Sequence, residues 1–293
     1  MRASNNLLLN GGALLKRINK LLALVVLAAV AILICSLSGC GLVNKLRAKN
    51  NLNEGVRNFN SGKYDIAQDR FQDAMELDPD SANAQLFYAR AVNARFDQKQ
   101  TPEFGLKALD AYEKIIANNK DNPQTVDKAL AFESKVYDQL GTLSPDKADE
   151  YKQKSRELLL KRADIATGPD APATKAAVYY TIGQAYWQES YGISKMYTKT
   201  LPGGQLNFQP PPAEQQDKMR EAVLKGHEYL QKALSVKPDY ADAYAYEKLL
   251  YIEEYKLEQN PAKKQELLNK EKEAGDTFKK YHDQQAQAAQ AGQ

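Results

Sequence analysis

The sequence predicts an all-α fold in which helix-turn-helix hairpins follow one another and stack as a solenoid. Prolines recur at nearly even intervals, because Pro79, Pro102, Pro123, Pro145 and Pro169 are 23, 21, 22 and 24 residues apart. Proline suits the first turn of a helix and breaks its interior, so this spacing marks helices of roughly 15 to 20 residues joined by short turns. Between the prolines, apolar residues recur at helical spacing, and no segment shows sustained strand alternation.

These signals predict about five hairpins. Thr101-Pro102-Glu103 has the order of an N-cap, a first-turn proline and a first-turn acid, and Ser144-Pro145-Asp146 repeats that order. A single hairpin cannot bury its apolar face alone, so stacked neighbours are expected to supply the core. The hairpins are expected at approximately 44–80, 81–121, 123–167, 172–236 and 239–284.

Two segments depart from the hairpin pattern. Residues 190–214 contain a Pro-Gly-Gly run and a triple proline, so a loop insertion is expected within the fourth hairpin. A loop of that length is either functional or a tolerated surface insertion. Residues 286–293 have no apolar period and are expected to form a disordered tail. The repeat domain is therefore expected over 40–285.

One stretch, GVRNFNSGKYDIAQDRFQDAMELDPDSA, has small, aromatic and turn-forming residues at offsets that resemble a tetratricopeptide repeat (TPR). That family repeats a 34-residue helix-turn-helix unit. Small residues let its helices approach closely, an aromatic residue fills the gap between hairpins, and a glycine permits the turn. The matching residues here are Gly55, Gly62, Tyr64, Ala67, Phe71, Ala74 and Pro79. A second match contains Gly226, Ala233 and Pro238, with leucine in place of the aromatic residue.

The N-terminal segment places basic residues before an apolar run and a cysteine. Leu21–Cys35 is fifteen apolar residues, and Leu37-Ser38-Gly39-Cys40 follows it. This order resembles a bacterial lipoprotein signal, in which the cysteine receives diacylglycerol and the chain is cut before it. The resemblance implies that residues 1–39 are a signal peptide and that Cys40 is lipidated.

A retained membrane anchor is the alternative for the same segment. Leu21–Val43 is 23 uncharged residues, enough to cross an apolar layer of roughly 30 Å. Both interpretations place the N-terminus in the cytoplasm and the body outside it, because the flanking charges are basic. In the lipoprotein pattern, Gly41 after the cysteine favours the outer membrane, whereas the anchor would leave the protein at the cytoplasmic membrane.

The composition of the body excludes several classes of function. Removing the four basic residues that precede Lys45 leaves 36 basic and 37 acidic residues, so no excess of positive charge indicates nucleic-acid binding. Both cysteines, Cys35 and Cys40, lie in the N-terminal segment, which excludes thiolate chemistry in the body. His227 and His282 are 55 residues apart and are interpreted as surface or packing residues. No metal, cofactor, small-molecule substrate or catalytic residue is therefore expected, and the protein is not expected to be an enzyme.

Aromatic residues gather in the C-terminal part, where twelve of the 17 tyrosines lie between Tyr179 and Tyr281 with the single tryptophan. Most are expected to fill gaps between hairpins, but such rings also suit peptide recognition. In TPR proteins the first helix of each hairpin lines an inner groove. Transferring those offsets implies a peptide-binding groove formed by Asn83, Arg90, Asn93, Tyr180, Gln184, Trp187, Asp242, Tyr246 and Glu253.

The two resemblances together imply a membrane-anchored TPR lipoprotein that acts as a scaffold or adaptor in the bacterial cell envelope. It would face the periplasm and bind other envelope proteins or peptides. A single-pass transmembrane TPR protein on the outer face of the cytoplasmic membrane is the alternative within this class. An envelope enzyme or solute-binding receptor that uses residues 190–214 as a lid is the alternative from a different class. Converging carboxylates beneath that loop would favour it.

Overall fold

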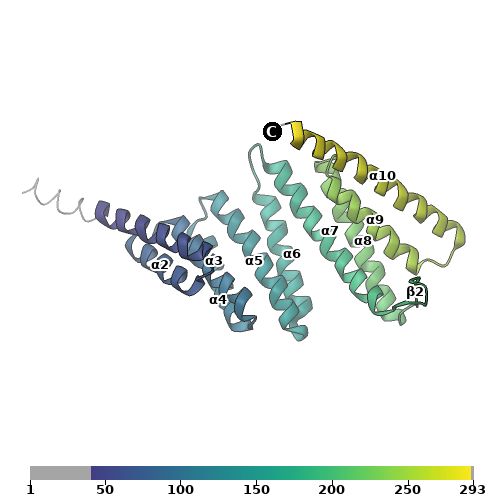
Figure 1. Ribbon diagram of the computed structural model, residues 1–293, viewed down its shortest axis with the longest axis horizontal. Coiled ribbons are helices and arrows are strands. Elements are labelled where there is room, and N and C mark those ends of the chain that lie inside the picture. The colour runs from purple at the N-terminus through teal and green to yellow at the C-terminus, as the bar shows by residue number, and fades with distance from the viewer. Residues whose placement is uncertain (1–40, 292–293) are drawn as a thin grey trace, which may run out of the picture. The chain divides into compact units, whose positions relative to one another are not determined.

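The computed structural model describes residues 41–291, and these are almost entirely helical (Figure 1). The predicted all-α fold is therefore confirmed. The described residues form two compact units, one over 41–99 and the other over 100–291. The predicted signal peptide and Cys40 lie outside the described residues. Within the described range, no helix combines the length and the apolar character needed to cross a membrane.

The first unit contains a helix over 41–60, α2 (Tyr64–Leu77) and α3 (Ala82–Lys99). Phe71 of α2 is fully buried and stacks on Phe87 of α3, with ring centroids 5.4 Å apart. A β-carbon at Gly55 would overlap the Phe71 ring, so the absence of a side chain there lets the helix over 41–60 approach α2. Gly62 has a φ of 73° in the turn between these two helices, a conformation that favours glycine.

The second unit consists of consecutive helices that pack against their neighbours in the sequence, with one small strand pair. Its elements are α4 (Pro102–Asn118), α5 (Pro123–Leu143), the 3-10 turn η1 (Pro145–Lys147), α6 (Ala148–Ile165), α7 (Ala171–Met196), β1 (Thr198–Thr200), β2 (Leu206–Phe208), α8 (Ala213–Val236), α9 (Ala241–Leu257) and α10 (Pro261–Ala291).

The helix pairs agree with the predicted hairpins. The helix over 41–60 and α2 form the first hairpin, and the pairs α5–α6, α7–α8 and α9–α10 form the third, fourth and fifth. Helices also occur at the two halves of the predicted second hairpin, but α3 belongs to the first unit and α4 to the second. The prolines mark helix boundaries because they lie at the starts of helices, as Pro102 does in α4 and Pro123 in α5.

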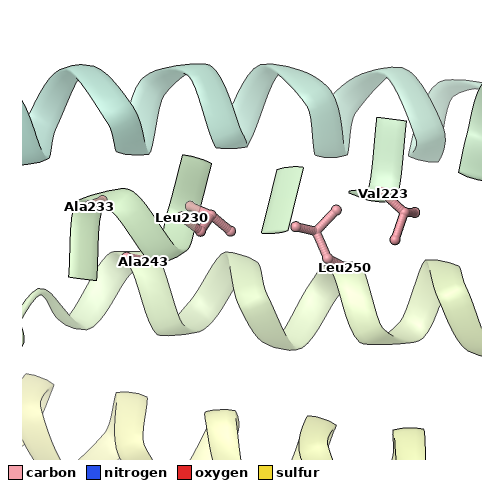
Figure 2. Close-up of a cluster of buried hydrophobic side chains, with 5 residues drawn as sticks. All are labelled: Val223, Leu230, Ala233, Ala243 and Leu250. Carbon is pink, nitrogen blue, oxygen red and sulfur yellow. The ribbon is translucent and has the colours of Figure 1, made fainter. Parts of the chain in front are cut away.

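The core of the second unit includes a cluster shared by α8 and α9. Val223, Leu230 and Ala233 come from α8, and Ala243 and Leu250 come from α9. In Figure 2 these side chains lie in the layer between α7 and α9, where α8 is largely cut away. A β-carbon at Gly226 would lie 2.8 Å from a terminal carbon of Leu250, so this glycine permits the close contact of α8 with α9.

Pro79 and Pro238, the prolines of the two repeat matches, occupy similar turns. The carbonyl of Pro79 accepts a hydrogen bond from Gln85 Nε2 at 2.7 Å, and that of Pro238 accepts one from Tyr244 Oη at 3.1 Å. Each donor is six residues further along the chain, in the next helix. Each bond gives a partner to the carbonyl of a proline that lies in the turn between two helices.

The predicted loop over 190–214 is wrong at its N-terminal end, because α7 continues to Met196. Residues 190–196 contain no proline, and Ser190 and Ser194 are fully buried, so packing extends the helix. Residues 197–212 contain the strand pair, in which Thr198 pairs with Phe208 and Thr200 with Leu206. Gly203 and Gly204 have φ values of 97° and 83° and supply the turn.

The predicted disordered tail over 286–293 is also wrong for the residues described, because α10 runs to Ala291. The segment from Asp283 to Ala291 is rich in alanine and glutamine, which have high helix propensity, and it contains no glycine or proline. Gln285 Nε2 also donates a hydrogen bond to the carbonyl of Asp239 at 3.2 Å. Helix propensity therefore continues α10 where no apolar period is present.

Replacement of Gly55 by alanine tests the close helix contact in the first unit. The new β-carbon would overlap the Phe71 ring, which is fully buried, so we expect Gly55→Ala to lower the free energy of unfolding by about 1–3 kcal/mol. Gly192→Ala is the control, because Gly192 lies within α7 with open space around it. That variant should be neutral or slightly stabilising. Denaturant unfolding followed by circular dichroism measures both, and equal effects would contradict the steric explanation.

Candidate functional site

Five aromatic side chains of α7 and α9 form a continuous row, which we call the aromatic wall. Tyr180, Trp187 and Tyr191 come from α7, Tyr246 comes from α9, and Tyr240 is the residue just before α9. Successive ring centroids are 5.1 Å apart for Tyr240–Tyr180, 5.5 Å for Tyr180–Tyr246, 5.2 Å for Tyr246–Trp187 and 5.1 Å for Trp187–Tyr191. Each ring thus touches the next, from the N-terminal end of α9 to the C-terminal half of α7.

Helical spacing places the α7 members of the wall on one face of that helix. Positions 180, 184, 187 and 191 are separated by four, three and four residues, so they share one helical face. Tyr191 is 40% exposed, and the other four rings are half-buried. The rings are thus held by their neighbours and still reach solvent.

A polar side chain ties the two helices together within the wall. Gln184 Nε2 donates a hydrogen bond of 2.6 Å to Tyr246 Oη.

Burial raises the pKa of Tyr180, and the neighbouring Tyr246 and Asp242 raise it further. Tyr180 therefore keeps a neutral hydroxyl group, which can donate or accept hydrogen bonds.

The structure brings four of the predicted groove residues together: Tyr180, Gln184, Trp187 and Tyr246. Asp242 is exposed near the Tyr180–Tyr240 end. Glu253 has a different environment from the one predicted, because it is only 2% exposed and accepts a 2.7 Å hydrogen bond from Lys256 Nζ. A buried, ion-paired carboxylate is not available to line an open groove.

The other three predicted groove residues belong to α3 in the first unit. Asn83 is exposed, and Asn93 is half-buried. The Arg90 guanidinium lies over two rings, 5.3 Å from the centroid of Phe59 and 5.4 Å from that of Phe87. Within this unit, Arg90 therefore covers the aromatic core between the helix over 41–60 and α3.

The sequence interpretation missed two members of the wall, Tyr191 and Tyr240. Tyr191 is four residues after Trp187, so helical spacing alone could have identified it. Tyr240 precedes the first residue of α9, and its contact with Tyr180 depends on how the fourth and fifth hairpins pack. No sequence signal identifies such a contact.

His227 of α8 is a partly buried polar group whose partners come from α9. Its Nδ1 lies 2.6 Å from Glu247 Oε2, and its Nε2 forms an ion-pair contact of 3.7 Å with Glu254. The imidazole also packs on Tyr251, with ring centroids 4.6 Å apart. Burial by itself lowers the pKa of His227, but the two carboxylates raise it to about 9. His227 is therefore a charged link between α8 and α9, whereas sequence analysis treated it as a surface or packing residue.

Comparison with known proteins gives structural similarities only. No protein-family model matches the chain, and no curated protein sequence matches it. A crystal structure of MamA aligns over 81% of this chain and 94% of its own, at 16% identity and a TM-score of 0.44. YrrB, described as a TPR protein with an unusual peptide-binding site, aligns over 76% and 84%, at 14% identity and a TM-score of 0.36. PilF of Pseudomonas aeruginosa aligns over 82% and 91%, at 17% identity and a TM-score of 0.39. At these values the matches add nothing about ligands to what the helices show.

The His227 link predicts a specific dependence of stability on pH. Its pKa of about 9 in the folded state lies above the ordinary value of 6.5. The stabilising contribution is therefore fully present below pH 6.5 and is lost as the pH rises through 9. As the pH rises from 6.5 to 9, the free energy of unfolding should fall in the wild type, because His227 loses its charge. We expect this fall to exceed that of His227→Gln by on the order of 1–3 kcal/mol. His282→Gln is the control, because His282 is exposed on α10. Equal pH profiles for wild type and His227→Gln would contradict this assignment.

Proposed function

We propose that the protein is an interaction scaffold that binds an extended segment of another protein along the aromatic wall. The observation that carries this proposal is the unbroken row of five partly exposed rings from two successive hairpins. Aromatic side chains bring a large contact area and lose little conformational entropy when they bind. Tyrosine hydroxyl groups and the Gln184 amide supply hydrogen-bonding groups for a peptide backbone.

The packing of the wall also supports a binding role. Its rings hold one another in contact and Gln184 bonds to Tyr246, so the surface is ordered before a partner arrives. A preorganised surface loses less entropy on binding, which raises affinity for a given contact area. The resemblance of the hairpins to TPR units is consistent with this use.

The enzyme or receptor alternative predicts converging carboxylates beneath the loop predicted over 190–214, of which residues 197–212 lie outside helices. A pocket of about 800 Å³ does lie there, but its lining includes Lys195, Lys256 and Lys264 and no carboxylate from the described part of the chain. The geometry therefore favours recognition of a partner over acid–base chemistry at this place.

The proposal extends to the location of the protein. The basic, apolar and Leu37-Ser38-Gly39-Cys40 regions support a lipoprotein signal and anchoring by lipid at Cys40. Two acyl chains suffice for stable membrane attachment, whereas one chain is marginal. On this proposal the scaffold works in the bacterial cell envelope, faces the periplasm and binds envelope proteins. Gly41 favours the outer membrane, and a retained helix over 21–43 remains the alternative anchor at the cytoplasmic membrane.

Truncation of the wall tests the binding proposal. We expect Trp187→Ala with Tyr191→Ala to reduce partner recovery by about tenfold or more, because buried aromatic anchors dominate binding energy. Recovery is measured by quantitative mass spectrometry after crosslinking in intact cells. The control is Tyr244→Ala, because Tyr244 stacks on Tyr281 of α10 outside the wall. Unchanged recovery from a folded double variant would contradict binding at the wall.

Intact mass spectrometry of the membrane-extracted protein tests the anchor. We expect the wild type to lack residues 1–39 and to carry acyl chains, and Cys40→Ala to have neither change. The reason is that acylation of the Cys40 thiol precedes cleavage in the lipoprotein pattern. A full-length, unacylated mass for both proteins would contradict lipidation and establish a retained N-terminal helix.

A further inference from the structure

A pocket of about 800 Å³ lies between the β1–β2 hairpin and the C-terminal half of α9, and we call it the hairpin pocket. Three aromatic and three basic side chains give it its chemical character. They are Tyr191, Lys195, Phe208, Tyr255, Lys256 and Lys264. The pocket thus combines apolar ring surfaces with ammonium groups.

The charge of the lining is unbalanced. Lys256 Nζ is held by Glu253 at 2.7 Å and by Ser194 Oγ at 3.1 Å, so the buried Glu253 carboxylate offsets its charge. Lys195 and Lys264 have no ion-pair partner among the residues described, and no carboxylate of that range lines the pocket. Two ammonium charges therefore remain to attract an anion.

Aromatic rings lie beside two of the three lysines, Lys256 and Lys264. Lys256 Nζ is 6.0 Å from the Tyr191 ring centroid and 5.9 Å from that of Phe208, and Lys264 Nζ is 5.0 Å from that of Tyr255. An anion that reaches the ammonium groups must therefore pass close to aromatic faces. The matching ligand carries an apolar group directly next to its negative charge.

The hairpin pocket continues the aromatic wall. Tyr191 lines the pocket and also stacks on Trp187, with ring centroids 5.1 Å apart. A chain that lies along the wall toward Tyr191 therefore enters the pocket without leaving ring surface. The body has no excess of basic residues to follow a phosphate backbone, so a peptide fits this path better than a nucleic acid.

We propose that the hairpin pocket binds the carboxylate of an acidic peptide segment whose neighbouring residues are apolar, at one end of the aromatic wall. This inference rests on the proposed function, because it names the chemical class of the segment that the wall would bind. Lys195 and Lys264 supply hydrogen bonds and charge to the carboxylate, which are stronger than contacts between neutral groups. Phe208 of the hairpin and Tyr255 of α9 supply contact area for the apolar neighbours.

The test uses Trp187, the only tryptophan in the chain, as a fluorescent probe beside the pocket. The titrants are two peptides with blocked termini, serine and alanine flanks, and a central Phe-Glu-Phe or Phe-Gln-Phe. We expect the Glu peptide to bind about tenfold more tightly, a difference of about 1.4 kcal/mol. The double variant Lys195→Gln/Lys264→Gln should remove this difference. A third peptide, Phe-Gln-Phe with a free C-terminal carboxylate, shows whether a chain terminus can replace the side chain.

The control is Lys279→Gln/Lys280→Gln on α10, which makes the same change in net charge. Lys280 also lies 5.0 Å from a tyrosine centroid, that of Tyr281, but it does not line the hairpin pocket. This variant should keep the preference for the Glu peptide. Equal wild-type affinities for the Glu and Gln peptides, a preference that survives in Lys195→Gln/Lys264→Gln, or no response to any peptide would overturn the inference. These peptide results test only the ligand of the hairpin pocket. The proposed function is tested separately by partner recovery with the Trp187→Ala/Tyr191→Ala protein, and it fails only if that recovery is normal.

Discussion

The positions of α7, α8 and α9 depend on two glycines at close contacts between these helices. A β-carbon at Gly183 of α7 would lie 2.7 Å from Leu230 of α8, and one at Gly226 of α8 would lie 2.8 Å from Leu250 of α9. The leucine side chains occupy the space that the glycines leave, and both are fully buried. Interiors at native packing density tolerate little added volume, so this contact sets the distance between helices. The spacing of the rings on α7 and α9 follows from it.

Polar contacts fix how these helices are aligned along their axes. Leu250 in the space beside Gly226 already restricts movement of α9 along α8, because a residue with a side chain at that place would collide with the leucine. The His227–Glu247 hydrogen bond fixes the two helices at one register, and the Gln184–Tyr246 bond does the same for α7 and α9. Lys256 joins α9 to Ser194 near the end of α7. Apolar contacts thus hold the helices together, and a few hydrogen bonds specify how they align.

Local signals predicted most of the fold, and contacts between hairpins explain most of what was missed. Proline at helix starts and Gly62 in a turn act within one or two residues, so the helix pairs could be located from the sequence. Four of the groove residues implied by the TPR resemblance lie together in the structure, and the resemblance assigned them to the first helices of the fourth and fifth hairpins. The burial of Glu253, by contrast, depends on its place within the packed hairpins, and the Tyr240–Tyr180 contact joins positions 60 residues apart. The start of the loop over 190–214 was placed too early because the packing of Ser190 and Ser194 extends α7 up to Met196. The tail over 286–293 was missed because helix propensity outweighed the absence of an apolar period.

The aromatic wall takes its rings from both the fourth and the fifth hairpin, so neither hairpin contains it alone. A pulling force that separates the two hairpins would divide Tyr180 and Trp187 from Tyr246 while each helix pair stays folded. In a stack whose stability comes from contacts between neighbours, such a joint can open before the repeats themselves unfold. The surface is therefore sensitive to tension, and a ligand that spans both hairpins would stiffen the joint that it occupies.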